Sequence, residues 1–213
     1  MNEKTVELNP PLDRIEGLIP AVIQHARTGE VLMLGYMNQA ALEQTVQSRL
    51  VTFYSRSKQR IWVKGESSGN HLDLIDIHQD CDRDTLLVRC LPRGPTCHNG
   101  TTSCFGDSLG PPLGFLGELQ AVVDRRFEEK PQGSYIAKLI SQGLDRMAQK
   151  VGEEGVETVI AAKNPDDAAL LGEAADLLFH LTVLLRARGL SLAQVAQVLE
   201  SRHAVKKEMP PPV

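Results

Sequence analysis

The feature that most constrains the fold is a change in hydrophobic periodicity near residue 110. Before it, apolar residues alternate in short segments rich in β-branched side chains, a pattern typical of strands. After it, they recur every three or four positions, which is typical of amphipathic helices. Residues 106–114, between the two patterns, are rich in Gly and Pro. We therefore predict an α+β chain, with a mainly antiparallel β domain over residues 1–110 and an all-α helical-bundle domain over residues 114–213.

The spacing of apolar and turn-forming residues predicts the elements of each half. In the first half, a helix is predicted after Asn38, and strands are predicted at residues 18–26, 31–37, 50–54, 60–64, 72–77 and 85–90. In the second half, helices are predicted before Pro131, from Ser134 to Gly143, through residues 147–160, at residues 168–185 and after Ser191. Residues 206–213 end in three prolines, and we expect a frayed tail there.

Charge narrows the classes of partner. The formal net charge is −4, and it divides equally between the residues before and after position 111. Because neither half is strongly basic, bulk binding of nucleic acid or of an anionic membrane is not expected. The first residues are acidic and no uninterrupted apolar run of about 18 residues occurs, so we expect neither a signal peptide nor a membrane span. The expected location is the cytoplasm.

The cysteines are the first indication of chemistry. All four lie between residues 81 and 104, and in a reducing compartment grouped cysteines bind metal or perform chemistry. Cys81, Cys97 and Cys104 would supply three thiolates, the donor set of a catalytic zinc site with one position open for water. Cys90 would close the site as a fourth ligand, but it lies in a strand pattern, where a free Cys is a small buried hydrophobe. We favour the core interpretation of Cys90.

Charged residues beside the cysteines add two candidates. Asp80, Asp82 and Asp84 alternate, so in an extended segment their carboxylates share one face, opposite Cys81. Such a row suits Mg²⁺, and the alternative is three solvated turn aspartates. The segment is no EF-hand, because the sixth position lacks Gly and the twelfth lacks Glu. His98, next to the second cysteine, is either a base or substrate contact or an exposed loop histidine.

A basic segment precedes the cysteines. Residues 54–70 combine four cations with small hydroxyl side chains and two glycines across a predicted hairpin. The candidates for holding phosphate oxygens are Arg56, Lys58, Lys64, Ser67 and Ser68. The alternative is a solvated hairpin that binds nothing. Trp62, in the same segment, is more typical of a core or an interface than of a base-stacking platform.

The helical half carries two acidic pairs. Glu154 and Glu157 are three residues apart, as are Glu173 and Asp176, so each pair lies on one face of a helical turn. The second pair lies in an otherwise apolar helix, and we predict that it faces the bundle interior. Four carboxylates on two facing helices repel one another unless a cation joins them, which predicts a Mg²⁺ site that takes substrate phosphates. The alternative, a solvated acidic face, is credible for the first pair because Lys150 is nearby.

Two motif sets resemble known families. Residues 53–105 contain S-R-S, W-V-K-G-E-S-S-G, D-C-D-R-D-T-L-L and G-P-T-C-H-N-G-T-T-S-C-F, and they closely resemble phosphoribosyl-AMP cyclohydrolase, with the match extending back to about Gly17. The helical half contains A-Q-K-V-G-E-E-G-V-E-T and E-A-A-D-L-L-F-H, and it resembles phosphoribosyl-ATP pyrophosphohydrolase. Together the resemblances cover nearly the whole chain, in the order of the fused bifunctional histidine-biosynthesis enzymes.

The resemblance implies a hydrolase in which the second domain makes the substrate of the first. Pyrophosphate would leave phosphoribosyl-ATP after water attacks its α-phosphorus. Zinc-activated water would then attack C6 of the adenine in phosphoribosyl-AMP, and the N1–C6 bond would open. The implied cofactors are Zn²⁺ and Mg²⁺. A homodimer is implied, because the zinc cysteines of the family come from both subunits.

The resemblance also assigns roles residue by residue. The implied zinc ligands are Cys81, Cys97 and Cys104, and the implied magnesium ligands are Asp80, Asp82, Asp84, Glu154, Glu157, Glu173 and Asp176. The candidate catalytic residues are His98, Lys64 and Glu153. The candidate substrate-binding residues are Arg56, Ser57, Lys58, Trp62, Glu66, Ser68 and Lys150. Asn99 stands where many members carry Thr, which leaves every ligand in place.

Two other functions compete with this one. The acidic motif is shared with general nucleoside-triphosphate pyrophosphatases, so the helical half alone is compatible with that activity. A non-enzymatic alternative makes the first half a structural zinc module and the second a helical interaction bundle. That alternative needs a closed zinc site with four ligands, and the sequence offers only three clear thiolates.

Overall fold

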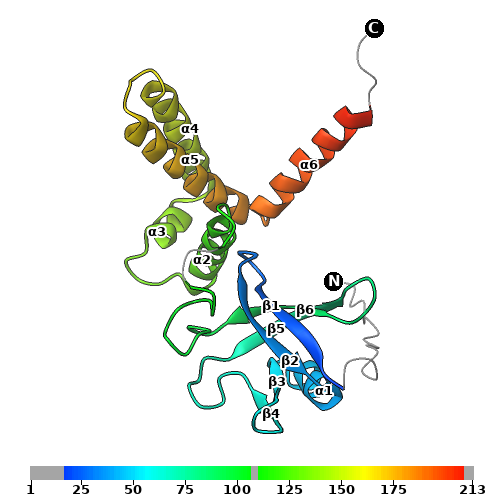
Figure 1. The fold of residues 1–213 in the computed structure, drawn as a ribbon. Helices are drawn as coiled ribbons and strands as arrows, with labels where there is room; N and C mark the ends of the chain where they lie inside the picture. Colours follow the sequence, from blue (N-terminus) through cyan, green and yellow to red (C-terminus); the bar gives the residue numbers. More distant parts are fainter. Residues whose placement is uncertain (1–16, 107–109, 209–213) are drawn as a thin grey trace. The chain divides into compact units, whose positions relative to one another are not determined.

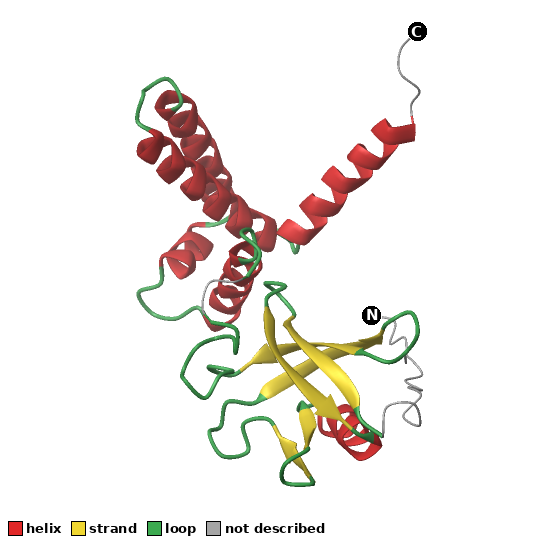
Figure 2. Cartoon of the chain, in the orientation of Figure 1, coloured by secondary structure: helices red, strands yellow, loops and turns green. Residues whose placement is uncertain are grey.

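The computed structural model describes residues 17–106 and 110–208, with side chains described as far as residue 203. The chain divides into two compact units, Met1–Phe115 and Leu116–Val213 (Figure 1). Within the described residues, strands are confined to the first unit and most of the helical residues to the second (Figure 2). The predicted α+β class, with a mainly antiparallel β part followed by an all-α part, is confirmed.

The first unit contains two sheets. The larger has the strand order β2-β1-β6-β5, formed by β2 (Val31–Met37), β1 (Ile19–His25), β6 (Leu86–Pro92) and β5 (Leu72–Gln79). The β1–β2 and β5–β6 pairs are antiparallel, whereas β1 and β6 are parallel. The smaller sheet is the β3–β4 hairpin (Thr52–Ser55 and Arg60–Val63). Helix α1 (Gln39–Ser48) begins at the predicted cap, where the Asn38 side chain accepts a hydrogen bond from Ala41 N.

Alternation along the strands builds the core of this unit. Every second residue of β1 is buried, as period-two geometry requires when one face of a sheet is covered. Phe53 of β3 is fully buried and lies against Gly35 of β2, where an added Cβ would come within 2.4 Å of the ring. Cys90 is also fully buried, which confirms its core interpretation, and burial raises the pKa of its thiol to about 12.

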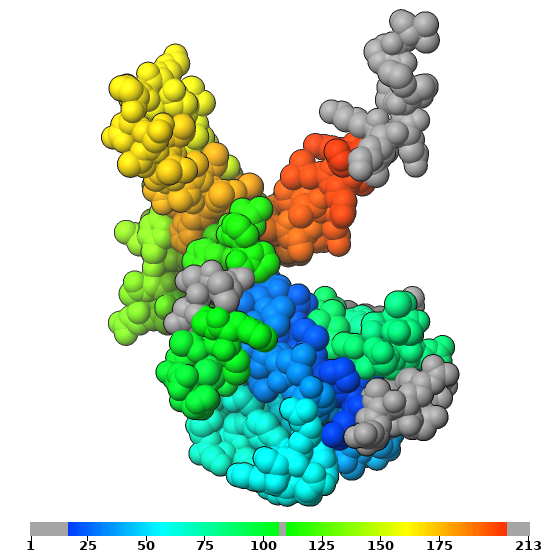
Figure 3. Space-filling model, viewed as in Figure 1, coloured from blue at the N-terminus to red at the C-terminus, as the bar shows by residue number. Residues whose placement is uncertain are grey.

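The second unit consists of helices. They are α2 (Phe115–Glu129), α3 (Tyr135–Gln142), α4 (Leu144–Ala161), α5 (Asp167–Ala187) and α6 (Leu192–Glu208). Ser134 caps α3 as predicted, and Gly143, at φ 88°, separates α3 from α4. Helices α4 and α5 pack against each other along their length (Figure 3). Their pairing brings the two predicted acidic segments together.

Two expectations for the helical unit need correction or comment. The predicted frayed tail is wrong for residues 206–208, which continue α6, and its remaining residues lie outside the described part of the chain. By length and mean hydropathy alone, α5 is apolar enough to cross a membrane, a property that core helices of soluble proteins share. This helix also carries Glu173 and Asp176, so it is not a continuous apolar run.

The Gly- and Pro-rich segment packs on the first unit where it is described. Pro111 lies against Gly29 in the β1–β2 turn, and an added Cβ at Gly114 would come within 2.6 Å of the Thr28 carbonyl oxygen. Residues 110–114 are therefore docked against the sheet unit, and the division between the compact units falls after Phe115.

Candidate active sites

Two of the predicted zinc cysteines line a cavity of about 670 Å³ in the sheet unit. Cys97 and Cys104 both lie in the loop after β6. Cys104 N donates to the carbonyl oxygen of Leu32 at 2.7 Å, and the Ser103 hydroxyl donates to the carbonyl oxygen of Val31 at 2.8 Å. These bonds hold the loop against β2 and keep both thiols at the cavity wall.

The two thiols differ in acidity. The pKa of Cys97 is lowered, first by the backbone N–H of Asn99 and then by the Thr101 hydroxyl, because both donate toward the sulfur. The pKa of Cys104 is raised, chiefly by burial and then by the negative charge on Cys97. Lys64 lies close enough to oppose that rise. The pair therefore favours one thiolate, at Cys97, which is the protonation state a metal ligand or nucleophile needs.

The third predicted zinc cysteine lies apart from this pair. Cys81 is exposed in the loop between β5 and β6. Among the described residues, two groups of at least three potential ligand atoms lie within 4.8 Å of one another, and neither contains Cys81 with Cys97 and Cys104. A single chain therefore presents two of the three thiols together.

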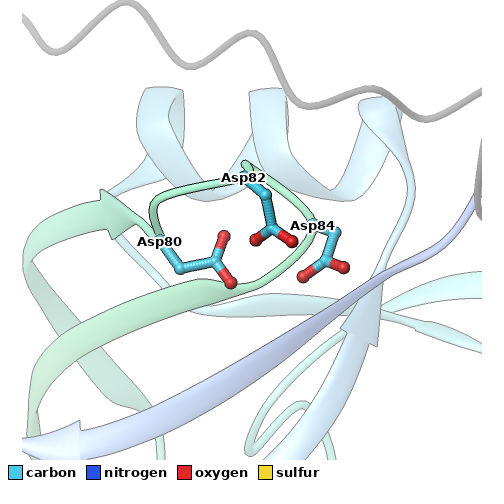
Figure 4. Close-up of side chains that lie close together, drawn as sticks. All are labelled: Asp80, Asp82 and Asp84. Atoms are coloured by element: carbon cyan, nitrogen blue, oxygen red, sulfur yellow. The ribbon is translucent and has the colours of Figure 1, made fainter.

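The three predicted aspartates do converge. Asp80, Asp82 and Asp84 form one of the two groups, and their exposed carboxylates turn toward one another in the β5–β6 loop (Figure 4). The reason differs from the predicted one, because residues 81–84 form bends instead of an extended segment, with Arg83 at φ 68°. Thr85 stabilises the loop, since its backbone N donates to Asp80 Oδ1 at 3.1 Å.

The basic hairpin contributes several cavity residues. The predicted residues that line the cavity are Lys58, Trp62, Lys64, Glu66, Ser67, Ser68 and His98. Trp62 packs on the core against Phe53, with ring centroids 5.3 Å apart, and still reaches the cavity. The exposed His98 places Nδ1 3.9 Å from the sulfur of Cys97.

Two predicted substrate-binding residues lie elsewhere. Arg56 and Ser57 line a neighbouring groove of about 650 Å³ between β2 and β3. The Arg56 guanidinium lies 4.0 Å from the centre of the Tyr36 ring, a cation–π contact. The structure therefore does not place Arg56 with the other cations of the cavity.

Sequence reasoning missed several cavity residues, and two of them, Arg60 and Thr96, carry polar groups of interest. Arg60 donates to Glu66 Oε1 at 2.5 Å, and this hydrogen bond lowers the pKa of the Glu66 carboxyl. Thr96 is buried at 3% exposure, and its hydroxyl has no hydrogen-bond partner among the described residues. Its position directly before Cys97 was a signal that could have found it. An orphan hydroxyl at a cavity wall is suited to a polar ligand atom.

The acidic residues of α4 and α5 form the second group of potential ligands. Glu154, Glu157 and Glu173 place carboxylate oxygens within 4.8 Å of one another. The Lys150 ammonium lies 2.6 Å from Glu154 Oε1, and it holds the pKa of that carboxyl low although the side chain is buried. The pKa of Glu157 is raised, because its carboxyl shares a hydrogen bond with Glu154. Asp176 lies outside this group.

The burial of the acidic pairs differs from the prediction, although Glu157 of the first pair is exposed as the solvated alternative expected. Glu173 is only half-buried and Asp176 is exposed, so this pair does not face the interior of a single chain. Glu154, from the pair that looked more solvated, is 5% exposed. The prediction failed because the apolar surface of α5 is itself largely uncovered, with Leu171 70% exposed.

Glu153 forms an ion-pair network with side chains from the preceding turns of α4. Glu153 Oε1 accepts hydrogen bonds from Arg146 at 2.8 Å and from Gln149 at 2.9 Å, and Oε2 lies 2.9 Å from Lys150. Hydrogen bonds from Lys150 first, and then from Arg146, lower the pKa of Glu153. Glu153 thus reaches the acidic group through Lys150.

Sequence reasoning did not assign His180 or its partner Tyr135 to the helical site. His180 of α5 is 5% exposed, and its Nε2 lies 3.6 Å from Glu154 Oε1 and 3.3 Å from the hydroxyl of Tyr135. Burial lowers the pKa of His180, although the charge of Glu154 opposes this. Its place one turn beyond Asp176 was a signal in the sequence, since residues four apart share a helix face.

Comparison with known families agrees with both sites. The phosphoribosyl-AMP cyclohydrolase family matches residues 33–106, which include the thiol cavity and the three aspartates. The phosphoribosyl-ATP pyrophosphohydrolase family matches residues 116–203, which include the acidic group of α4 and α5. The chain is therefore a bifunctional hydrolase that carries one domain of each kind. The second match also decides against the general nucleoside-triphosphate pyrophosphatase, and both decide against the non-enzymatic alternative.

Full-length relatives show the family. The histidine biosynthesis bifunctional protein HisIE of Xylella fastidiosa (strain Temecula1) is 61% identical over 196 residues, which span 91% of this chain and 94% of the relative. The proteins of the same name from Escherichia coli (strain K12) and Bacteroides thetaiotaomicron are 53% and 49% identical, over 90% of this chain and 94% and 95% of the relatives. The chain belongs to the family of histidine biosynthesis bifunctional proteins HisIE. Its substrates are phosphoribosyl-ATP and phosphoribosyl-AMP.

Proposed function

We propose that the thiol cavity of the sheet unit opens the adenine ring of phosphoribosyl-AMP with the help of zinc held by Cys97, Cys104 and a copy of Cys81. The observation that carries this proposal is the pairing of Cys97 and Cys104 at the wall of a cavity. The donor set fits the metal, because thiolate sulfur is a preferred zinc ligand and the backbone N–H of Asn99 stabilises a thiolate at Cys97. When bound there, zinc would supply an activated water, since zinc lowers the pKa of bound water to about 7.

The chain's own residues would bind the substrate and move its protons. The ammonium groups of Lys58 and Lys64 face the cavity and would hold phosphate oxygens, with Ser68 as a further hydrogen-bond donor. Lys64 also lies where it would stabilise negative charge near Cys104. Glu66, which is held by its ion pair with Arg60, would orient a substrate group. The ring would lie against Trp62.

Ring opening adds the oxygen of water to C6, breaks the N1–C6 bond and returns a proton to N1. His98 is exposed and lines the cavity, and an imidazole there would take a proton from water and give one to the leaving nitrogen. Arg56 and Ser57 lie in the adjacent groove and would contribute only if the substrate extends into it.

We propose that the active enzyme is a homodimer. Cys81 lies apart from the other two thiols in one chain, and a two-fold symmetric dimer would bring the partner's copy to the cavity. The helical unit supports association, because exposed apolar side chains cluster on α4 and α5. They are Val156, Val159, Ile160, Leu171 and Leu178. A second copy would remove this surface from water.

The acidic group of α4 and α5 is proposed to hold Mg²⁺ for the release of pyrophosphate from the bound triphosphate nucleotide. Oxygen ligands from Glu154, Glu157 and Glu173 converge as a hard divalent cation requires, with Asp176 one turn along α5. Magnesium would orient the triphosphate and neutralise its charge. Lys150, held by Glu153, is placed to meet a phosphate oxygen. Asp80, Asp82 and Asp84 are proposed to hold a second Mg²⁺ in the sheet unit.

We further propose that residues 1–110 and 114–213 contain the two activities, and that the enzyme works in the cytoplasm. The free thiols among the described cysteines are compatible with a reducing compartment. Because residues 110–114 dock on the β1–β2 turn, a cut after Phe115 should preserve both units better than a cut after Gly110.

Mixing two inactive variants tests the shared zinc site. Cys81→Ser and Cys97→Ser should each lose ring opening, and a mixture that exchanges subunits should regain about a quarter of wild-type activity, since half of randomly paired dimers are mixed and each has one intact site. Cys90→Ser mixed with either variant should give half of the wild-type activity whether or not subunits exchange, so it controls for inactivation by the mixing itself. A mixture as inactive as its components, under conditions where mixed dimers are detected, would place all three thiols in one chain.

A further inference from the structure

His180 is a buried polar group that the proposed chemistry does not yet use. It lies on the part of α5 that faces α3 and α4, and its ring packs against Tyr135 and Phe179, with centroid separations of 5.7 Å and 5.2 Å. Its Nδ1 is buried and has no hydrogen-bond partner among the described residues. Its Nε2 is the nitrogen that meets polar groups, at Tyr135 and Glu154.

The surroundings indicate where the ring carries its proton. A bare nitrogen lone pair beside the carboxylate of Glu154 would be repelled, whereas an N–H there is attracted. A proton on Nε2 lies between the Tyr135 hydroxyl and Glu154 Oε1, at 3.3 Å and 3.6 Å from the nitrogen. The second distance is longer than a hydrogen bond, so the N–H acts on the carboxylate by electrostatic attraction, while the rings of Tyr135 and Phe179 hold the imidazole in place.

Lys150 acts on the same oxygen. Its ammonium lies 2.6 Å from Glu154 Oε1, so two donors approach this one atom from α4 itself and from α5. The other oxygen of Glu154 is then the one left for a cation shared with Glu157 and Glu173. A carboxylate held in this way cannot rotate freely, and ligands that are held by outer partners bind metal more tightly.

We propose that His180 is a positioning residue of the pyrophosphohydrolase site, which with Lys150 fixes Glu154 Oε1 and so presents the second oxygen of Glu154 to the metal. The inference rests on the proposed magnesium site. If His180 only filled space, an apolar side chain or an amide of either length would replace it without loss. The geometry requires a donor at the position of Nε2.

Three substitutions separate these possibilities in the full-length chain. His180→Gln places an amide N–H near the position of Nε2, His180→Asn places it near Nδ1, and His180→Leu removes it. The probe is Mn²⁺, titrated while the electron paramagnetic resonance of free Mn²⁺ is recorded. Asp82→Asn and Asp84→Asn are present throughout, so that the aspartate group of the sheet unit does not contribute. His203→Asn, at an exposed position on α6, is the matched control.

The affinity for Mn²⁺ should fall about 10–100-fold in His180→Asn and His180→Leu, and by less than about threefold in His180→Gln and His203→Asn. The kcat for pyrophosphate release should follow the same order, while helical circular dichroism stays at the parent level. Should His180→Leu fail to fold, the Gln and Asn variants decide. Equal affinities in these two would overturn the positioning role. Absence of Mn²⁺ binding in the parent would overturn the proposed metal site itself.

Discussion

The two units differ in how much of their core and of their candidate site a single chain supplies. Among the described residues, the core of the sheet unit contains fifteen buried apolar residues, whereas that of the helical unit contains five. The helical unit instead leaves large apolar side chains of α4 and α5 in solvent. Its carboxylate group is nevertheless assembled within one chain, while the better-packed sheet unit has its thiols in two places. Completeness of a core and completeness of a site are therefore independent.

The two sites also differ in the hardness of their ligands. The sheet unit offers thiols at a cavity, and the helical unit offers carboxylates between two helices. Soft sulfur selects zinc, and hard oxygen selects magnesium. The two reactions should consequently respond to different metals.

Metal removal should have the largest effect and should separate the units completely. A zinc-selective chelator in excess Mg²⁺ should abolish ring opening while pyrophosphate release continues, and both products are measured in the same assay. Cys97→Ser should reproduce this loss without chelator. The matched control, Cys90→Ser, should keep zinc and activity and cost about 1–3 kcal/mol in the free energy of unfolding, since it places a hydroxyl in the core. Equal sensitivity of both reactions to the chelator would argue against separate sites.

Loss of a single carboxylate should inactivate the other unit. Glu173→Gln should lower the kcat for pyrophosphate release by more than the ~10–100-fold that loss of an outer partner costs, because it removes a proposed ligand. Without metal, the variant should unfold at an equal or slightly higher temperature, since repulsion among Glu154, Glu157 and Glu173 is relieved. Full activity would remove Glu173 from the site, and loss of helical circular dichroism would make its role structural.

A charged side chain among the exposed apolar residues of α4 and α5 should lower the stability of the helical unit selectively. Leu171→Glu should lower the unfolding temperature of this unit by about 5 °C or more, the shift expected for ~1 kcal/mol in a domain of this size. It should also abolish the dependence of that temperature on protein concentration, which association produces. Val46→Glu, at an exposed position of α1, is the control. A wild-type unfolding temperature that is independent of concentration would contradict a dimer through this face.

The smallest expected effect concerns an ion pair in the sheet unit. Arg89 Nε donates to Asp76 Oδ1 at 2.7 Å. Hydrogen bonding from Arg89 is the largest influence on the pKa of Asp76 and lowers it, although burial acts in the opposite direction. A lowered pKa in the folded state stabilises the fold above the ordinary Asp range, and the contribution disappears as pH falls through the folded-state pKa. Asp76→Asn should therefore cost ~0.2–1 kcal/mol at pH 7 and nothing at strongly acidic pH. A cost that persists in acid would exclude the ion pair as its cause.

Local patterns were sufficient to predict most of the fold. Alternation in β1, the Asn38 and Ser134 caps and the break at Gly143 all act within a few residues, so the sequence shows them directly. The parallel pairing of β1 with β6 was not predicted, because strands that are distant in sequence carry no local mark of their partner. The predicted fraying was wrong at residues 206–208, because they continue a helix that begins at Leu192.

The candidate sites were predictable by residue type but not by placement. Helical spacing predicted Glu154 and Glu157 on one face and a second pair on a facing helix, and the structure brings Glu173 to them but not Asp176. The sequence did not reveal that Arg56 turns to Tyr36, that Cys81 lies apart, or that His180 from α5 approaches Glu154. Each of these depends on side-chain direction or on contacts between distant segments, and periodicity reports neither.

The most direct test of two independent sites is complementation between full-length variants. Cys97→Ser alone should convert phosphoribosyl-ATP to phosphoribosyl-AMP and stop there, and Glu173→Gln alone should leave phosphoribosyl-ATP unchanged while still opening the ring of added phosphoribosyl-AMP. Mixed together, the two should convert phosphoribosyl-ATP to the ring-opened product, because the intermediate can diffuse from the helical site of one chain to the thiol cavity of another. A mixture that accumulates phosphoribosyl-AMP, although each variant retains its own reaction, would contradict independent sites and require transfer within a single chain.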